Sequence, residues 1–197
     1  MPAAVGRPRI FDIEAAIRTA QAVFWRHGYE ATSLAALAEA IGVHKPSLYA
    51  AYGDKRAIYL EAYDAYQRDA GRLVAAALGK LRLRDALTTF FASDLDLFTA
   101  DRGVGCFMLA TALPLAGTDP EIANRVRTAL ASLRSAVVGR LEQADEQREL
   151  AAHLQIETAA DLVLSTHIAL ANRARSGEPR EALNKSVQRV IDVICAS

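Results

Sequence analysis

The sequence predicts an all-α protein built from two helical domains. Apolar residues recur every three or four positions along most of the chain, which is the periodicity of amphipathic helices. Short glycine-containing breaks separate these stretches. Pro120 and Pro179 each lie just inside a predicted helix start, where the missing N–H costs nothing. No stretch alternates convincingly in the manner of a strand, so folds that contain a sheet are not favoured.

Composition narrows the class of protein further. The chain has 197 residues, of which 52% are apolar and 23% charged, as is typical of a soluble helical protein. No apolar run reaches the roughly 18 residues that span a bilayer, and the N-terminus lacks a signal-peptide pattern, so a cytoplasmic location is expected. Cys106 and Cys195 form neither a disulfide framework nor a CxxC pair, and neither a metal nor a cofactor is expected.

Three helices are predicted near the N-terminus. The first covers 12–27, the second follows a cap at Thr32 or Ser33 and ends at Gly42, and the third covers 44–52. Two short helices joined by a glycine-containing turn, packed on a preceding helix, form the layout of a helix-turn-helix. Spacing alone supports a plain helical hairpin equally well.

The rest of the chain is also predicted to be helical. The breaks between its helices contain glycine, aspartate or proline, which are common stop signals. The expected helices cover 55–79, 82–99, 105–115, 119–143, 156–176 and 179–195.

Specific residues favour the helix-turn-helix over the hairpin. From Gly28 to Val43 the chain reads GYEATSLAALAEAIGV, and from His44 to Lys55 it reads HKPSLYAAYGDK. With its spacing intact, this stretch closely resembles the DNA-binding domain of TetR-family regulators. The resemblance implies a TetR-like fold: a three-helix DNA-binding domain over 1–55 and a larger helical effector-binding and dimerisation domain over 56–197.

The resemblance also implies a function and its partners. The protein is expected to be a homodimeric transcriptional repressor, with activation as the alternative, on a palindromic double-stranded operator. An unidentified small hydrophobic ligand would release it from the DNA. By the same resemblance, the predicted helices 156–176 and 179–195 would form a four-helix bundle across the dimer axis.

The predicted base contacts lie on the third helix. A recognition helix needs its first turn against base edges and small residues where it meets the groove floor. Residues of these kinds are His44, Lys45, Pro46, Ser47, Ala50 and Ala51.

Other residues are expected to contact the DNA backbone. Tyr49 is predicted to reach a phosphate, as are Lys55 at a helix N-terminus and Thr32 or Ser33 at the preceding one. A half-buried packing role is the alternative for Tyr49. Arg7 and Arg9 belong to a short basic arm that could follow the minor groove, with a disordered tail as the alternative.

The middle helices are rich in aromatic and polar-tipped side chains. In TetR-like proteins this region encloses an inducer pocket, and a mostly apolar cavity with few polar groups suits a small hydrophobic ligand. Ordinary core packing is the alternative for each side chain. The candidate ligand-binding residues are Tyr66, Phe90, Cys106, Phe107, Met108 and His167.

A more specific hypothesis concerns the reactivity of the Cys106 thiol. It follows Gly105 at the expected start of the helix over 105–115, where the helix N-terminus and nearby Arg102 would favour the thiolate and make it available to electrophiles or oxidants. The alternative is a small buried apolar residue, because free cysteine is among the most buried residue types.

Two other function classes compete with DNA binding. An enzyme could use Cys106, His153 and His167, but the sequence contains no P-loop, GxGxxG, GxSxG or HExxH motif, so none is expected. A helical protein-interaction module is the second alternative. Net charge is zero, although residues 1–56 hold seven basic and five acidic side chains, a net +2. Salt-dependent binding to genomic DNA would discriminate between these classes.

Overall fold

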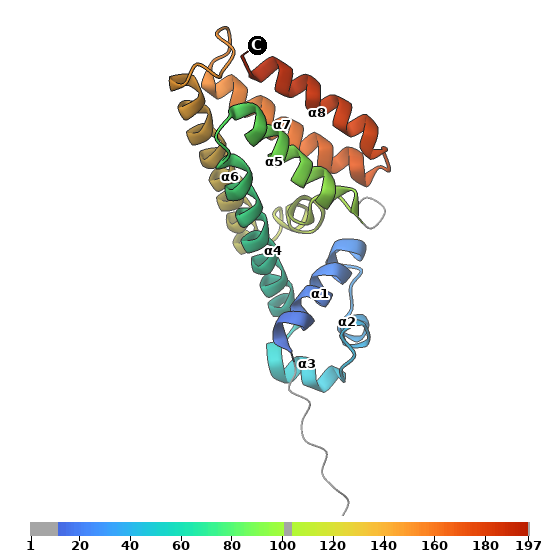
Figure 1. Ribbon diagram of the computed structural model, residues 1–197. Helices are drawn as coiled ribbons and strands as arrows, with labels where there is room; N and C mark the ends of the chain where they lie inside the picture. Colours follow the sequence, from blue (N-terminus) through green and yellow to red (C-terminus); the bar gives the residue numbers. More distant parts are fainter. Residues whose placement is uncertain (1–11, 101–103, 197) are drawn as a thin grey trace, which may run out of the picture. The chain divides into compact units, whose positions relative to one another are not determined.

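The computed structural model describes residues 12–100 and 104–196. Within these ranges the chain is helical, with one isolated β-bridge between Leu150 and Cys195, and the predicted all-α class is confirmed (Figure 1). The α-helices are α1 (Ile13–His27), α2 (Leu34–Ile41), α3 (Lys45–Tyr52), α4 (Lys55–Leu78), α5 (Leu83–Phe98), α6 (Pro120–Glu146), α7 (Ile156–Arg175) and α8 (Arg180–Ile194). Two further segments are the π-helix η2 (Met108–Ala112) and the 3-10 helix η3 (Leu113–Leu115).

The chain divides into two compact units, residues 1–65 and 66–197. The division lies inside α4, whereas the boundary expected from the sequence lies at the start of that helix. The first turns of α4 therefore belong with α1, α2 and α3.

The first unit packs four helices around one apolar core. Phe24, Leu37, Leu48 and Tyr59 come one from each helix and are fully buried. Leu48 is the only buried residue of α3, so this helix is anchored along one side and exposes the other.

Side-chain caps define the helix starts of this unit. Asp12 Oδ1 accepts a hydrogen bond from the Ala15 N–H at 3.1 Å, and Ser33 Oγ accepts one from the Ala36 N–H at 3.1 Å. Each cap satisfies an N–H that has no partner within its helix. Of the two caps that the sequence allowed for α2, the structure selects Ser33. Gly42 ends α2 in the left-handed conformation, with a φ of 78°.

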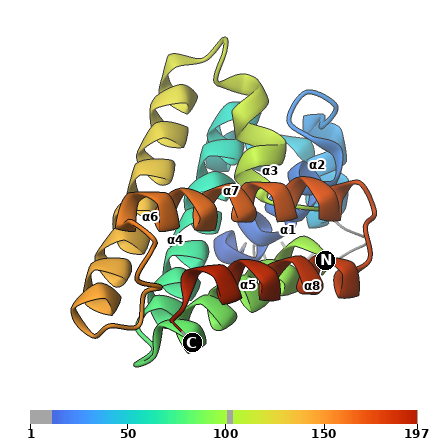
Figure 2. The same ribbon diagram turned by 90° about the horizontal axis from the view of Figure 1, so that it is seen from above.

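The second unit is a helical bundle in which α7 contacts α5, α6 and α8. Figure 2 shows α7 and α8 lying side by side. Glu149, in the loop between α6 and α7, accepts a hydrogen bond from the Leu83 N–H at 2.6 Å and pairs with Arg82 at 2.8 Å. These contacts hold that loop against the start of α5.

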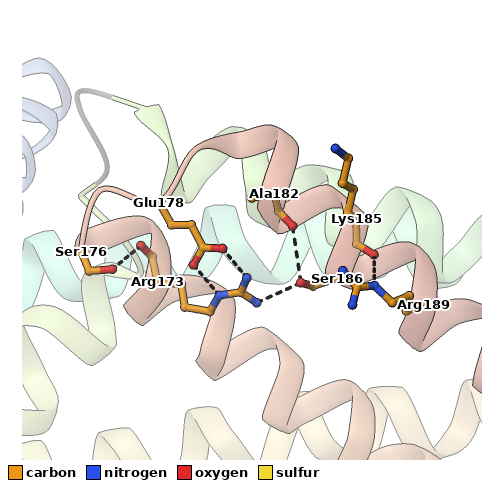
Figure 3. A network of polar contacts seen from close by, with 7 residues as sticks. All are labelled: Arg173, Ser176, Glu178, Ala182, Lys185, Ser186 and Arg189. Carbon is orange, nitrogen blue, oxygen red and sulfur yellow. Dashed lines mark hydrogen bonds and ion pairs between the residues drawn. The ribbon is translucent and has the colours of Figure 1, made fainter.

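A polar network closes the turn between α7 and α8 (Figure 3). The Arg173 guanidinium donates two hydrogen bonds to the Glu178 carboxylate, one of them from Nε at 2.6 Å, and a third from Nη1 to Ser186 Oγ at 3.1 Å. A planar guanidinium suits such a two-pronged contact with a carboxylate. The network fixes the start of α8 against the end of α7.

The predicted helix over 105–115 is wrong as a regular α-helix. Residues 104–106 are not helical, and η2 and η3 follow Phe107 in place of an α-helix. Pro114 gives a physical reason, because proline has no N–H to donate and its ring crowds the carbonyl one turn earlier. At the other predicted helices the type is confirmed, and α6 extends past the expected end at 143 to Glu146.

Candidate DNA interface and effector site

The solvent side of α3 carries the residues predicted to contact bases. Pro46 lies in the first turn, where its missing N–H breaks no helical hydrogen bond. With Leu48 buried beneath them, the neighbouring side chains form a continuous surface. The exposed residues of this surface are His44, Lys45, Pro46, Ser47, Ala50 and Ala51.

Tyr49 is also at the surface, with 47% of the residue exposed. The Lys45 Nζ atom lies 5.9 Å from the centre of the Tyr49 ring, one helical turn away. Lys45 and Tyr49 therefore present an ammonium and a phenol on the same exposed face of α3. Such groups can donate to a base edge or a phosphate.

The structure distinguishes the two hydroxyls at the start of α2. Thr32 is 2% exposed, and its Oγ1 donates to the Gly28 carbonyl at 2.7 Å. Ser33 is exposed while it caps the helix. Ser33 is therefore the one of the pair that a DNA phosphate could reach without rearrangement.

Lys55 has a structural partner that the sequence did not indicate. Its Nζ donates to the Tyr29 carbonyl at 3.1 Å and lies 4.2 Å from the centre of the Tyr29 ring. That ring packs against Tyr59 at 4.9 Å and Phe24 at 5.9 Å between centroids. Lys55 thus ties the start of α4 to the loop between α1 and α2. An ammonium has three donors, so this contact leaves others available for a phosphate.

The basic arm lies outside the described residues. Arg7 and Arg9 precede residue 12, where the described chain begins, and their minor-groove contact stays a prediction.

The predicted ligand-binding residues of the second unit converge on a buried polar cluster. Tyr66 Oη and Cys106 Sγ are 3.3 Å apart, and Cys106 is among the groups that raise the pKa of His167. Rings surround these groups: Phe107 lies 5.2 Å from Tyr66 and Phe90 lies 5.8 Å from His167, between centroids. Met108, next in the chain, is also buried.

Asp94 belongs to the same cluster and is the residue that sequence reasoning missed. His167 Nδ1 lies 2.8 Å from Asp94 Oδ2; Asp94 is buried, and the side chain of His167 is 12% exposed. Phe98 completes the surroundings at 5.3 Å from the imidazole. A signal was present, because Asp94 falls midway between Phe90 and Phe98 at four-residue spacing and therefore lies on the apolar face of α5.

Burial and pairing set the charges in the cluster. Burial alone would lower the pKa of His167, but the Asp94 carboxylate and the hydrogen bonds to Asp94 and Cys106 raise it to about 10. Burial raises the pKa of Asp94, and the imidazolium offsets part of that rise. Burial also raises the pKa of Tyr66 well above its usual value. A charged imidazolium beside a carboxylate is therefore the favoured state near neutral pH.

Close backbone packing fixes the position of Cys106. The Gly105 N–H donates to the Phe98 carbonyl at 3.1 Å, and the Arg175 guanidinium donates to the Val104 carbonyl at 3.0 Å. Gly105 has a φ of 69°, and a Cβ there would lie 2.7 Å from the Ala171 carbonyl oxygen. Only glycine allows this approach. The segment before Cys106 is thus held between the end of α5 and α7.

The expected cause of Cys106 reactivity needs correction. Cys106 does not begin a regular α-helix, so the predicted helix N-terminus is absent, and Arg102 lies outside the described residues. His153 is exposed and is not a partner in the contacts between Tyr66 and Cys106 or between Asp94 and His167.

Two further properties concern the described residues. None of the helices in the described ranges is long and apolar enough to cross a membrane. Among the same residues, no group of three or more histidine, cysteine, aspartate or glutamate side chains is arranged to hold a metal ion.

Two family models match the chain, one to each unit. The model described as "Bacterial regulatory proteins, tetR family" matches residues 16–62. The model described as "Tetracyclin repressor-like, C-terminal domain" matches residues 80–190.

Characterised and structural relatives agree with these matches. The HTH-type transcriptional repressor ComR of Escherichia coli (strain K12) is 33% identical over 181 residues, which are 90% of this chain and 86% of ComR. A cysteine mutant of the TetR family regulator CifR, solved with 26bp double-strand operator DNA, is 33% identical, has a TM-score of 0.77, and is matched over 94% of this chain and 98% of that one. A TetR regulator from Chloroflexus aurantiacus, 20% identical, shares the fold, with a TM-score of 0.81 over 93% of this chain and 96% of that one.

The pair of Asp94 and His167 predicts how stability depends on pH. Because folding raises the pKa of His167 from 6.5 to about 10, its contribution to the free energy of unfolding is fully present below pH 6.5 and is lost as pH rises toward 10. We expect urea denaturation to show that the stability advantage of the wild type over an Asp94→Asn, His167→Gln double variant shrinks across this window. The double variant avoids leaving one buried charge alone, and exposed His153→Gln is the control. A constant advantage would contradict the assigned charges.

Proposed function

This chain belongs to the TetR family of bacterial transcriptional regulators, and we propose that it is a homodimeric repressor that binds a near-palindromic operator through α3. The observation that carries the proposal is the exposed face of α3, where Lys45, Ser47 and Tyr49 project from a helix anchored by Leu48. ComR, named as a repressor, and CifR, solved on its operator, support the same role.

Direct readout by α3 follows from its chemistry. Lys45 and Ser47 can donate to acceptors in the major groove, and Pro46 offers an apolar contact to a thymine methyl group. We propose that Tyr49 and Ser33 bind phosphates and thereby fix the register of the helix in the groove. Thr32 would need to leave its buried hydrogen bond with Gly28 to do the same.

Dimerisation is proposed to use α7 and α8. Both helices keep large apolar side chains at the surface of the single chain: Ile168 is 38% exposed and Val193 is 48% exposed. A helix-turn-helix reads one half-site, and sufficient specificity at cellular salt normally takes two.

The operator predicted by this proposal has two related half-sites. Selection of bound fragments from random DNA should yield a near-palindrome whose half-site centres lie about 34 Å apart, or a multiple of that distance. Light scattering should find two chains, or a multiple of two, on each operator. A single half-site bound by a strictly monomeric chain would exclude the proposal.

Lys55 is proposed to contact a phosphate from the N-terminus of α4. Lys55→Ala should weaken binding to all DNA sequences about equally and reduce the slope of log affinity against log salt by about one. Lys45→Ala and Ser47→Ala should instead change base preference, since these residues are proposed to contact base edges.

The contact between Lys55 and Tyr29 requires a matched control. Tyr29→Leu removes the ring beside Lys55 but keeps the ammonium and the backbone carbonyl. If Lys55 acts only by holding Tyr29, both variants will lose affinity while the salt slope stays unchanged. That result would exclude a phosphate contact, and the measurement is fluorescence anisotropy at several salt concentrations.

The proposed effector site is the buried cluster that contains Tyr66, Phe90, Cys106 and His167. A small, mostly hydrophobic molecule would suit its aromatic walls and few polar groups. Release of DNA requires that the effector bind the two states of the dimer with different affinities. We propose Cys106 as the residue through which an electrophilic effector acts.

The thiol proposal predicts a selective loss of response. Cys106→Ser should bind operator as the wild type does but should no longer be released by a small electrophile. The check is operator affinity before and after treatment, with Cys195→Ser as the matched control that keeps the response. Equal sensitivity of the wild type and Cys106→Ser would reduce Cys106 to a packing residue.

A further inference from the structure

We propose that Tyr29 is a positioning residue for DNA binding: its ring and its carbonyl hold the Lys55 ammonium in place in the free protein, so that the contact with a phosphate costs less conformational freedom. The inference deepens the proposed function and rests on it, because it presupposes that Lys55 contacts a phosphate. Tyr29 itself acts through Lys55.

The turn between α1 and α2 fixes the backbone of Tyr29. Gly28 follows α1 with a φ of 79°, and its N–H donates to the Phe24 carbonyl at 2.8 Å. The Thr32 N–H donates to the Tyr29 carbonyl at 3.2 Å, while the Thr32 hydroxyl donates to the Gly28 carbonyl at 2.7 Å. A carbonyl oxygen has two lone pairs, so the Tyr29 oxygen can also accept from Lys55.

The ring of Tyr29 is fixed as well. It stacks on Phe24 with 21° between the ring planes and meets Tyr59 edge-on, and both of these residues are fully buried. A ring packed against two core rings cannot turn away without losing those contacts. Tyr29 therefore offers a rigid aromatic ring and a rigid carbonyl from the same residue.

Lys55 is held by both of these groups. Its Nζ donates to the Tyr29 carbonyl at 3.1 Å and lies 4.2 Å from the centre of the ring, inside the range of about 6 Å over which an aromatic face attracts a cation. A lysine side chain has many rotamers, and ordering them costs free energy. Here that cost is incurred during folding instead of during binding, which is how preorganisation raises affinity.

The ammonium that Tyr29 holds belongs to the start of a long helix. Lys55 is the first residue of α4, and the Asp54 carboxylate accepts the Ala57 N–H at 2.7 Å as a cap. An ammonium has three N–H donors, and the Tyr29 carbonyl takes one of them. The remaining donors can bind a phosphate oxygen, close to the N–H groups of the first helical turn.

A second lysine of the same unit is held less closely. Lys45 is exposed, and its Nζ lies 5.9 Å from the centre of the Tyr49 ring, near the limit of the attraction. Lys55 is half-buried and much closer to its ring. The tight seat at Lys55 is therefore not a general property of the lysines in this unit.

A purely structural role for this contact makes a different prediction. If Lys55 only ties α4 to the loop, replacing the Tyr29 ring disturbs the loop and lowers DNA affinity whether or not the ammonium is present. If Tyr29 positions Lys55, the same replacement lowers affinity only while the ammonium is there. A double-mutant cycle separates these two cases.

The test is such a cycle in the full chain. The probe is a double-stranded oligonucleotide of random sequence, because a phosphate contact carries no sequence information. Fluorescence anisotropy at several salt concentrations gives the affinity and the salt slope. Lys55→Met removes the ammonium and keeps most of the apolar stem. Tyr29→Leu removes the ring, Tyr29→Phe keeps it, and pentafluorophenylalanine in place of Tyr29 keeps its shape but reverses the charge of its face.

Positioning predicts a specific pattern. With Lys55 present, Tyr29→Leu and the fluorinated ring each lower affinity by about two- to fivefold, whereas Tyr29→Phe binds as the wild type does. The salt slope stays unchanged in these variants because the ammonium remains. Lys55→Met reduces the slope by about one. In the Lys55→Met background, none of the replacements at Tyr29 lowers affinity further.

Three outcomes would overturn the inference and leave the proposed function intact. The first is an equal loss of affinity from ring replacement with and without the ammonium. The second is no loss from either Tyr29→Leu or the fluorinated ring, and the third is a Tyr29→Phe variant as weak as Tyr29→Leu. Circular dichroism checks folding, and the fluorinated ring decides the matter if Tyr29→Leu does not fold.

Failure of the proposed phosphate contact gives a different result. In that case Lys55→Met changes neither the affinity nor the salt slope. Tyr29 then has no contact to support, and the inference falls together with the proposed role of Lys55.

Discussion

The hydrogen bond between Asp94 and His167 is the interaction on which the second unit depends. A carboxylate in an apolar interior needs a partner, and the imidazole of α7 is the one that the fold supplies. Meeting that need sets α5 against α7 and turns the histidine ring between Phe90 and Phe98. The polar chemistry of the cluster is thus a consequence of one buried charge being satisfied.

Backbone geometry makes this cluster possible. The segment that carries Cys106 can lie against α7 only because Gly105 has no side chain. Pro114 then prevents a regular helix from forming immediately afterwards. Phe107, the residue after Cys106, packs its ring against that of Tyr66 at 5.2 Å between centroids. Irregular structure at this point places a thiol, a phenol and an imidazole together.

The first unit depends on a different kind of joint. A charged hydrogen bond from Lys55 to the Tyr29 carbonyl links the start of α4 to the loop after α1. Ring contacts of Tyr59 with Tyr29 and with Phe24 strengthen the same link. This joint is separate from α3, which is anchored by Leu48 and leaves its polar residues in solvent. α4 contributes to both units, with Lys55 and Tyr59 in the first and Tyr66 in the second. The same helix therefore carries a residue of the DNA-binding unit and one of the buried cluster that is proposed as the effector site.

Local signals in the sequence determined the helices and the exposed face of α3. Helical periodicity, caps and glycine stops act over a few residues, so the stop at Gly42, the core position of Leu48 and a cap at Thr32 or Ser33 could be predicted without a structure. The DNA-binding motif is equally local, because its residues are contiguous. Such features need no knowledge of what lies far away in the chain.

Only the tertiary structure decided which distant side chains meet. Asp94 and His167 are 73 positions apart, and Cys106 and Tyr66 are 40 apart. No periodicity within one helix reports such a contact, although Asp94 on an apolar face indicates that some partner must exist. The link between Lys55 and Tyr29, the burial of Thr32 and the irregular segment after Cys106 were undecided for the same reason. Each depends on packing between elements, which the sequence of a single element does not contain.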